Sequence, residues 1–76
     1  MNDRLQQQYA MVHMRYEGRS WDVPAVELAI YPGMSDAEVR EAVARFLEVP
    51  VARLAYYVIE RYPNGNITLR PQAVFG

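Results

Sequence analysis

The side chains that carry most enzyme chemistry are few in this 76-residue chain, and they are not grouped. There is one histidine, His13, no cysteine and no lysine, and the only serines are Ser20 and Ser35. A catalytic histidine needs an orienting partner together with a nucleophile or a metal ion, and no spacing here supplies that set. We therefore expect His13 to be solvent-exposed or structural, and we expect the chain not to be an enzyme.

The acidic residues likewise form no ligand pattern. Asp36, Glu38 and Glu41 lie close together in the sequence, where the start of a helix accounts for them, and the other carboxylates are scattered. No spacing matches a calcium loop, and isolated glycines make no phosphate-binding loop. The absence of cysteine excludes thiolate metal sites and disulfides. The sequence therefore predicts neither a metal site nor a cofactor.

Length and charge describe one small domain. The formal net charge is −1, so no overall field draws the chain to nucleic acid or to an acidic membrane. No apolar run approaches the roughly 18 residues of a membrane span, and the polar stretch 1–8 lacks the apolar core of a secretion signal. We expect a cytoplasmic domain over residues 9–71, with a disordered or ragged lead at 1–8 and a short tail at 72–76.

Two strands are predicted in the first half of the chain. Apolar residues alternate over 9–17, which is typical of a strand with one buried face, and Gly18 then favours a tight turn. The next apolar stretch, 20–31, changes parity at Pro24. A bulge at this proline would return both sets of apolar residues to one face, so we place this strand at a sheet edge.

A helix is predicted to follow. Ser35 and Glu38 form a capping box, in which each side chain can bond the backbone amide of the other residue. Pro50 stops the helix near Glu48. The residues of one apolar stripe recur at helical spacing between these limits: Val39, Ala42, Val43, Phe46 and Leu47.

A second hairpin completes the chain. The third strand is predicted over 54–62 and the fourth begins over 67–70, joined by Asn64-Gly65, a strong short hairpin signal. The order is therefore strand, strand, helix, strand, strand. A right-handed crossover would place the last strand beside the first, parallel to it, in the middle of a mixed four-stranded sheet with the helix packed on one face. This α+β arrangement is the β-grasp, and another strand order is the alternative.

The helix exit and the third strand carry a resemblance. The run Val49-Pro50-Val51-Ala52-Arg53-Leu54, followed by the strand 56–59, resembles the corresponding part of ubiquitin and its small relatives. The capped helix after a two-stranded hairpin fits the same pattern, which covers about residues 9–71. The resemblance implies a ubiquitin-like β-grasp fold.

The sheet face away from the helix is the predicted binding surface. We assign the side chains of Tyr56 and Val58 to the core. The alternate side chains of the third strand, those of Tyr57, Ile59 and Arg61, are then expected to point away from the helix. Tyrosine and arginine are enriched in protein-binding hot spots, and in ubiquitin-like proteins this face often carries the partner-binding patch. We therefore expect a non-catalytic module that binds a protein partner. The candidate binding residues are Arg15, Tyr57, Ile59, Arg61 and Arg70.

Three alternatives remain open. Stacking on Tyr57 with phosphate contacts from the arginines would make a platform for single-stranded nucleic acid, although the acidic balance disfavours it. The terminal Gly76 resembles the reactive end of ubiquitin-like modifiers and sulfur carriers, but those families end in Gly-Gly and here the preceding residue is Phe75. A homodimer could also form through the edge of the second strand.

Overall fold

The computed structural model describes residues 10–72. In this part of the chain it is a small α+β domain with one α-helix and a four-stranded mixed sheet, which confirms the predicted class. The elements are β1 (Met11–Tyr16), β2 (Arg19–Pro24), the 3₁₀ segment η1 (Ala25–Leu28), helix α2 (Asp36–Leu47), the 3₁₀ segment η2 (Val51–Leu54), β3 (Tyr57–Arg61) and β4 (Ile67–Pro71).

The sheet has the strand order β2-β1-β4-β3. β1 pairs antiparallel with β2, β3 pairs antiparallel with β4, and the two hairpins join where β1 runs parallel to β4. The first and last strands therefore lie in the middle of the sheet, and β2 and β3 form its two edges.

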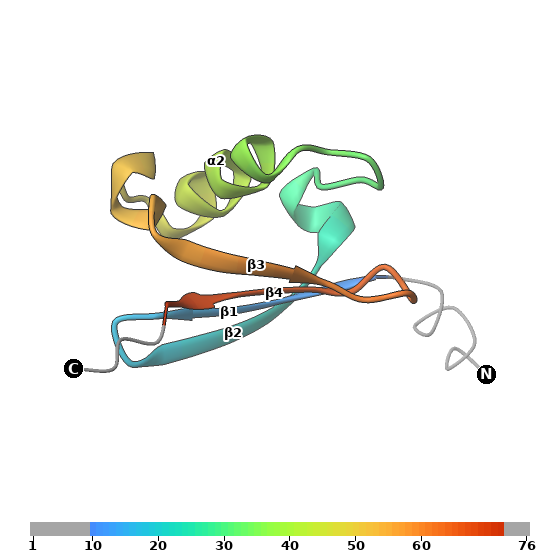
Figure 1. Ribbon diagram of the computed structural model, residues 1–76, viewed down its shortest axis with the longest axis horizontal. Helices are drawn as coiled ribbons and strands as arrows, with labels where there is room; N and C mark the ends of the chain where they lie inside the picture. The colour runs from blue at the N-terminus through green and yellow to red at the C-terminus, as the bar shows by residue number, and fades with distance from the viewer. Residues whose placement is uncertain (1–9, 73–76) are drawn as a thin grey trace.

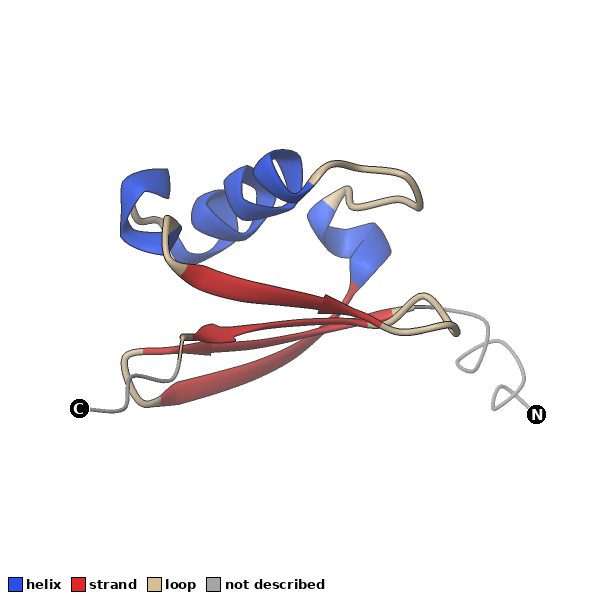
Figure 2. Ribbon diagram, viewed as in Figure 1, coloured by secondary structure: helices blue, strands red, loops and turns tan. Residues whose placement is uncertain are grey.

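The domain has two layers. Figure 1 shows α2 and both 3₁₀ segments on one side of the sheet, and Figure 2 shows no helical segment on the opposite side within the described residues. The core lies between the layers, and its largest fully buried side chains are Met14, Leu54, Leu69, Val12, Val39 and Val43. Among residues 10–72 no helix has the length and apolarity needed to cross a bilayer.

The two hairpin turns follow the sequence signals. Glu17 and Gly18 are the two central residues of the first turn, and both have positive φ, 50° and 80°, as a type I′ turn requires. In the second turn the Gly65 amide donates to the Tyr62 carbonyl at 2.9 Å, and Gly65 has a φ of 92°. A Cβ at Gly65 would lie 3.3 Å from that of Ala10, so both backbone conformation and space favour glycine there.

The second strand ends earlier than predicted, and the expected bulge at Pro24 is wrong. β2 stops at Pro24 and the chain turns into η1, whose capping residue Ala29 adopts the left-handed conformation. The Pro24 ring holds φ at −57° at the N-cap of this turn, and the Ala29 amide then donates back to the Val26 carbonyl at 3.2 Å, so the chain leaves the direction of the strand. The change of parity in the apolar residues reflects this 3₁₀ turn, which still directs Leu28 into the core.

Helix α2 agrees closely with the sequence. Ser35 is the N-cap, its hydroxyl accepts from the Glu38 amide at 3.1 Å, and the Glu38 carboxylate accepts from the Ser35 amide at 3.0 Å. One position of the predicted stripe differs: Phe46 is 40% exposed, whereas Ala44 is buried. Phe46 lies at the margin of the helix face, where it contacts Trp21 of the edge strand β2.

The third strand begins later and has the opposite parity to the one predicted. Leu54 is buried as expected, but it belongs to η2 and not to a strand. Tyr56 was assigned to the core and is 83% exposed, while Ile59 stands opposite the fully buried Leu69 and packs against the core. Side chains alternate along a strand, so Tyr57 and Arg61 share the helix side with Ile59, and Val58 and Glu60 face outward.

The N-cap gives a first test of this account. Ser35→Ala removes the acceptor for the Glu38 amide and should lower the free energy of unfolding by about 1 kcal/mol, measured by urea denaturation. Ser35→Asp retains an acceptor and should stay close to wild type. Equal losses in the two variants would contradict a capping role for this side chain.

Candidate functional site

The outer face of the sheet, the side without helical cover in the described residues, is the candidate site. Register places its side chains in rows across the strands, and one row runs from Asp22 through His13 and Thr68 to Glu60. Each of the four residues comes from a different strand. A ligand on this face would therefore meet a surface that all four strands hold in position.

A histidine–aspartate pair occupies the β1–β2 part of the row. The Nδ1 atom of His13 lies 2.6 Å from Oδ1 of Asp22, and the two side chains are 43% and 68% exposed. Among residues 10–72 this is the one hydrogen bond of the His13 side chain. The contact fixes the orientation of the ring and links the edge strand to β1.

A second cross-strand group lies over β3 and β4. The Arg70 guanidinium donates to both carboxylate oxygens of Glu60, at 3.4 and 3.1 Å, and the Tyr62 hydroxyl donates to Glu60 at 3.2 Å. The hydrogen bond from Arg70, then its charge, lowers the pKa of the Glu60 carboxyl. The same contact raises the pKa of Arg70. Both groups are therefore charged and mutually oriented at neutral pH.

Two depressions flank Thr68 on this face. One of about 300 Å³ is lined by Arg15 and Arg70 together with Ser20 and the His13–Asp22 pair. The other adjoins the β3–β4 turn and is lined by Tyr62, Pro63 and Asn66. Arg15 is exposed, and among residues 10–72 no ion pair involves it. The outer face thus combines one fixed charge pair, Glu60–Arg70, with the His13–Asp22 contact and the guanidinium of Arg15.

The predicted binding residues do not share one face. Arg15 and Arg70 lie on the outer face, as expected, but Tyr57, Ile59 and Arg61 lie on the helix side. The assumption that all five form one patch is therefore wrong. Gly76, the alternative reactive residue, lies outside the described residues, as do the predicted lead 1–8 and most of the predicted tail 72–76.

Tyr57 is held by aromatic packing. Its ring centroid lies 5.9 Å from that of Tyr16, and Tyr57 and Ile59 both pack against the core. Burial, with smaller contributions from Tyr16 and Glu17, raises the pKa of the Tyr57 hydroxyl. The flat stacking surface that a nucleic-acid platform would need at Tyr57 is not on the outer face.

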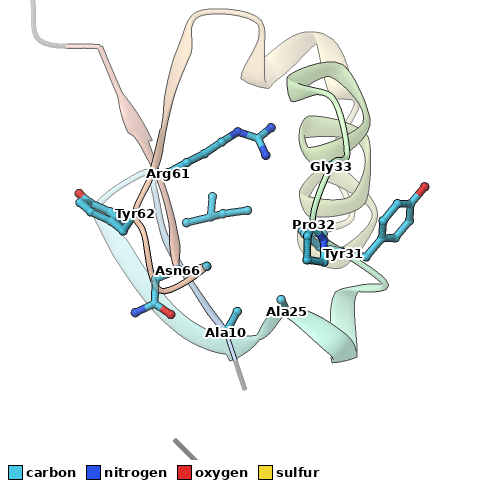
Figure 3. A pocket seen from close by; sticks show the side chains of 11 residues that line it. Ala10, Ala25, Tyr31, Pro32, Gly33, Arg61, Tyr62 and Asn66 are labelled. Atoms are coloured by element: carbon cyan, nitrogen blue, oxygen red, sulfur yellow. The ribbon is translucent and has the colours of Figure 1, made fainter. Parts of the chain in front are cut away.

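Arg61 lies beside a cleft of about 230 Å³ at the hairpin end of the molecule. Figure 3 shows the cleft between the β3–β4 hairpin and the segment Tyr31-Pro32-Gly33, with the Arg61 guanidinium extending toward the helix layer. That guanidinium donates to the Met34 carbonyl at 2.8 Å and to Asp36 at 2.6 Å. Its charge is therefore balanced within the fold, and the cleft is smaller than usual small-molecule sites.

Sequence reasoning missed the acidic partners on the outer face. Asp22 and Glu60 were treated as scattered carboxylates, although each stands opposite a named residue of the neighbouring strand, His13 and Thr68. The turn signals at Gly18 and Asn64-Gly65 fix the register of both hairpins. Counting outward from the Glu17-Gly18 turn would have placed Asp22 opposite His13. The second turn has three residues between Tyr62 and Asn66, one more than a two-residue Asn-Gly turn, so the same count would have placed Glu60 opposite Leu69 and missed Thr68.

The fold and the site define a small α+β domain, in which one face of the sheet carries a fixed charge pair and has no helical cover within residues 10–72. In the described residues no group of three or more metal-ligating side chains is present. Comparison of the chain with models of protein families, with curated proteins and with solved structures finds no match.

Strand parity can be tested on adjacent residues of β3. Ile59→Ala should lower the free energy of unfolding by about 2 kcal/mol, because it removes methylene groups packed on the core. Val58→Ala, on the outer face of the same strand, should cost less than about 1 kcal/mol. Denaturant titration of both variants measures the difference, and a larger loss for Val58→Ala would reverse our assignment.

The Glu60–Arg70 contact predicts a dependence of stability on pH. The folded-state pKa of Glu60 lies below its ordinary value near 4.5, so the contact stabilises the fold at neutral pH. This stability is lost as the pH falls through the folded-state value. The gap in melting temperature between wild type and Glu60→Gln should therefore shrink on acidification to about pH 3. Because the pair is exposed, added salt should also shrink the gap. If the difference in melting temperature changed with neither pH nor salt, the charge of Glu60 would not contribute to stability.

Proposed function

We propose that this chain is a non-catalytic protein-interaction module of the ubiquitin-like β-grasp type, which binds a protein partner through the outer face of its sheet. The β-grasp assignment is supported by two hairpins flanking a helix, with parallel first and last strands at the centre of the sheet. A fold supports many functions, so the functional argument depends on the outer face itself.

The observation that carries the proposal is the preorganisation of that uncovered face. Cross-strand contacts hold the side chains of His13, Asp22, Glu60 and Arg70. A partner binding there does not have to immobilise these groups, and the entropy lost on association is correspondingly smaller.

The chemistry of the face indicates the kind of partner. Asp22 and Glu60 each have a basic neighbour, whereas Arg15 lines its depression without an ion pair in residues 10–72. Arginine binds carboxylates through paired, planar hydrogen bonds. Half-exposed Tyr62 and partly buried Val58 supply apolar area beside the charges. A protein surface with one acidic group near an apolar contact fits this arrangement.

Matched charge reversals test the proposal. The full chain, tagged at its N-terminus, is used to recover partners from extracts of its own organism, with quantitative mass spectrometry. Arg15→Glu should reduce recovery of a stoichiometric partner at least about tenfold, equivalent to about 1.4 kcal/mol. Arg45→Glu on α2 makes the same change of net charge away from the outer face and should retain the partner.

The remaining outcomes separate the alternatives. Equal recovery by wild type and Arg15→Glu would overturn the assignment of the outer face. Deletion of Gly76 should leave recovery unchanged, and a loss confined to that deletion would place the function at the C-terminus. Thermal melts of the two substituted chains should lie close to wild type, since Arg15 and Arg45 are exposed. Arg45→Glu reverses a favourable charge in the last turn of α2, and a loss of up to about 1 kcal/mol is expected for that variant.

A further inference from the structure

The two edges of the sheet differ in how their backbone groups are covered. At β3, the Tyr62 amide donates to Asn66 at 3.0 Å, and alternation along the ladder then turns the backbone of Tyr57, Ile59 and Arg61 toward the edge. The Tyr57 carbonyl there accepts from the Arg40 guanidinium at 2.9 Å. The Arg61 side chain, on the helix side of the same strand, donates to the Met34 carbonyl at 2.8 Å. Another strand therefore cannot pair at the Tyr57 end of β3 without displacing the Arg40 contact.

The edge at β2 has no such cover in the described residues. The Ala25 amide donates to the Ala10 carbonyl at 2.8 Å, which continues the β1–β2 ladder. This bond shows which residues of β2 are hydrogen-bonded to β1, namely every second residue counted back from Ala25. By alternation, the amides and carbonyls of Ser20 and Asp22 point away from β1. Pro24 lacks an amide and ends this free stretch. An unpaired row of backbone groups is a template for another strand.

Apolar side chains lie next to the free edge on the helix side. Trp21 makes an edge-to-face contact with Phe46, with ring centroids 6.5 Å apart, and the Arg19 guanidinium lies 5.2 Å from the centre of the indole. Trp21 is only half-buried, Phe46 is 40% exposed and Val26 is 64% exposed. Helix α2 thus leaves apolar surface uncovered at the strand that also has free hydrogen-bonding groups.

We infer that β2 pairs with β2 of a second copy of this chain, antiparallel about a two-fold axis at Trp21, to form one continuous sheet. In this register Ser20 of each copy stands opposite Asp22 of the other, with backbone hydrogen bonds in both directions. On the outer face, each Ser20 hydroxyl can donate to the partner's Asp22, because His13 engages only Oδ1 of that carboxylate. On the helix side the two Trp21 rings meet across the axis.

Charge and backbone chemistry select this register over its neighbours. An axis at Asp22 would place two carboxylates directly opposite each other, which is destabilising. The same axis would pair Ser20 with Pro24, which has no amide to donate. An axis at Ser20 would pair Asp22 with Gly18, a turn residue with a φ of 80°. Only the axis at Trp21 uses strand residues throughout and opposes a donor to each carboxylate.

A second copy of the chain therefore fits this edge. When Ser20-Trp21-Asp22 is paired antiparallel with itself, each serine faces an aspartate and the tryptophans face each other. A two-fold symmetric contact requires such a self-complementary surface. Trp21 then stands at a non-hydrogen-bonded position, where facing side chains approach most closely and aromatic pairs contribute most to sheet pairing. The dimer engages Ser20 and Asp22, which also line the depression beside Arg15, but it does not use Arg15 or Arg70. The dimer Kd and the recovery of an outer-face partner are measured separately, so either proposal can fail without the other.

The first test introduces a negative or a positive charge at the same neutral position, Ser20. Sedimentation equilibrium of the full chain gives the dimer Kd. Ser20→Asp puts carboxylates opposite Asp22 of the other copy and should raise Kd about tenfold or more, whereas Ser20→Lys should not raise it. A chain that is monomeric at about 1 mM overturns the proposal. A dimer that responds equally to both substitutions places the contact elsewhere and also overturns it.

The second test reads the register directly, because the chain has no cysteine of its own. Ser20→Cys and Asp22→Cys chains are mixed and oxidised, and the disulfide-linked products are counted by intact mass. The mixed product should exceed the half that random pairing gives, since Cα atoms of facing residues lie within disulfide range. Random proportions, or an excess of either homodimer, would overturn the register.

Discussion

The arrangement of the molecule depends on two arginines that connect the edge strand β3 to the helix layer. Arg40 donates from α2 to the carbonyls of Leu54 and Tyr57, at 3.2 and 2.9 Å. Arg61 donates from the other end of β3 to the Met34 carbonyl and to Asp36, at the start of α2. Hydrogen bonds to a charged group contribute about 1.5–3 kcal/mol each. These contacts hold both ends of β3 against the helix.

This connection also determines which surfaces remain available. With Arg61 directed to the helix layer, alternation turns Tyr57 and Ile59 toward the core and leaves Glu60 on the outer face. There Glu60 meets Arg70, and the outer face acquires its fixed charge pair. Arg40 also occupies the Tyr57 carbonyl at the β3 edge. The opposite edge, β2, has no equivalent side chain within the described residues, and the two edges of one small sheet thus differ in their capacity to pair.

The sequence predicts the local elements better than it predicts the choice between faces. The helix was predicted correctly because Ser35 and Glu38 act within one turn, and both hairpins because Gly18 and Gly65 favour their turns locally. The parity of β3 was wrong because the run from Leu54 to Ile59 is almost entirely apolar or aromatic, so either face of that strand could have been buried. Contacts with Tyr16 and with the helix layer, distant in sequence, make that choice. The candidate patch failed for the same reason.

The outer face and the β2 edge lie at right angles to each other, so both can be occupied at once. Pairing at β2 would extend the sheet and set two outer faces side by side, related by the two-fold axis. A partner with two matching sites would then bind the second copy at a high effective concentration, and its affinity would exceed that for a single copy without any additional contact. A small domain with a limited binding area gains most from this arrangement, because association has a large entropic cost that one modest face offsets only in part.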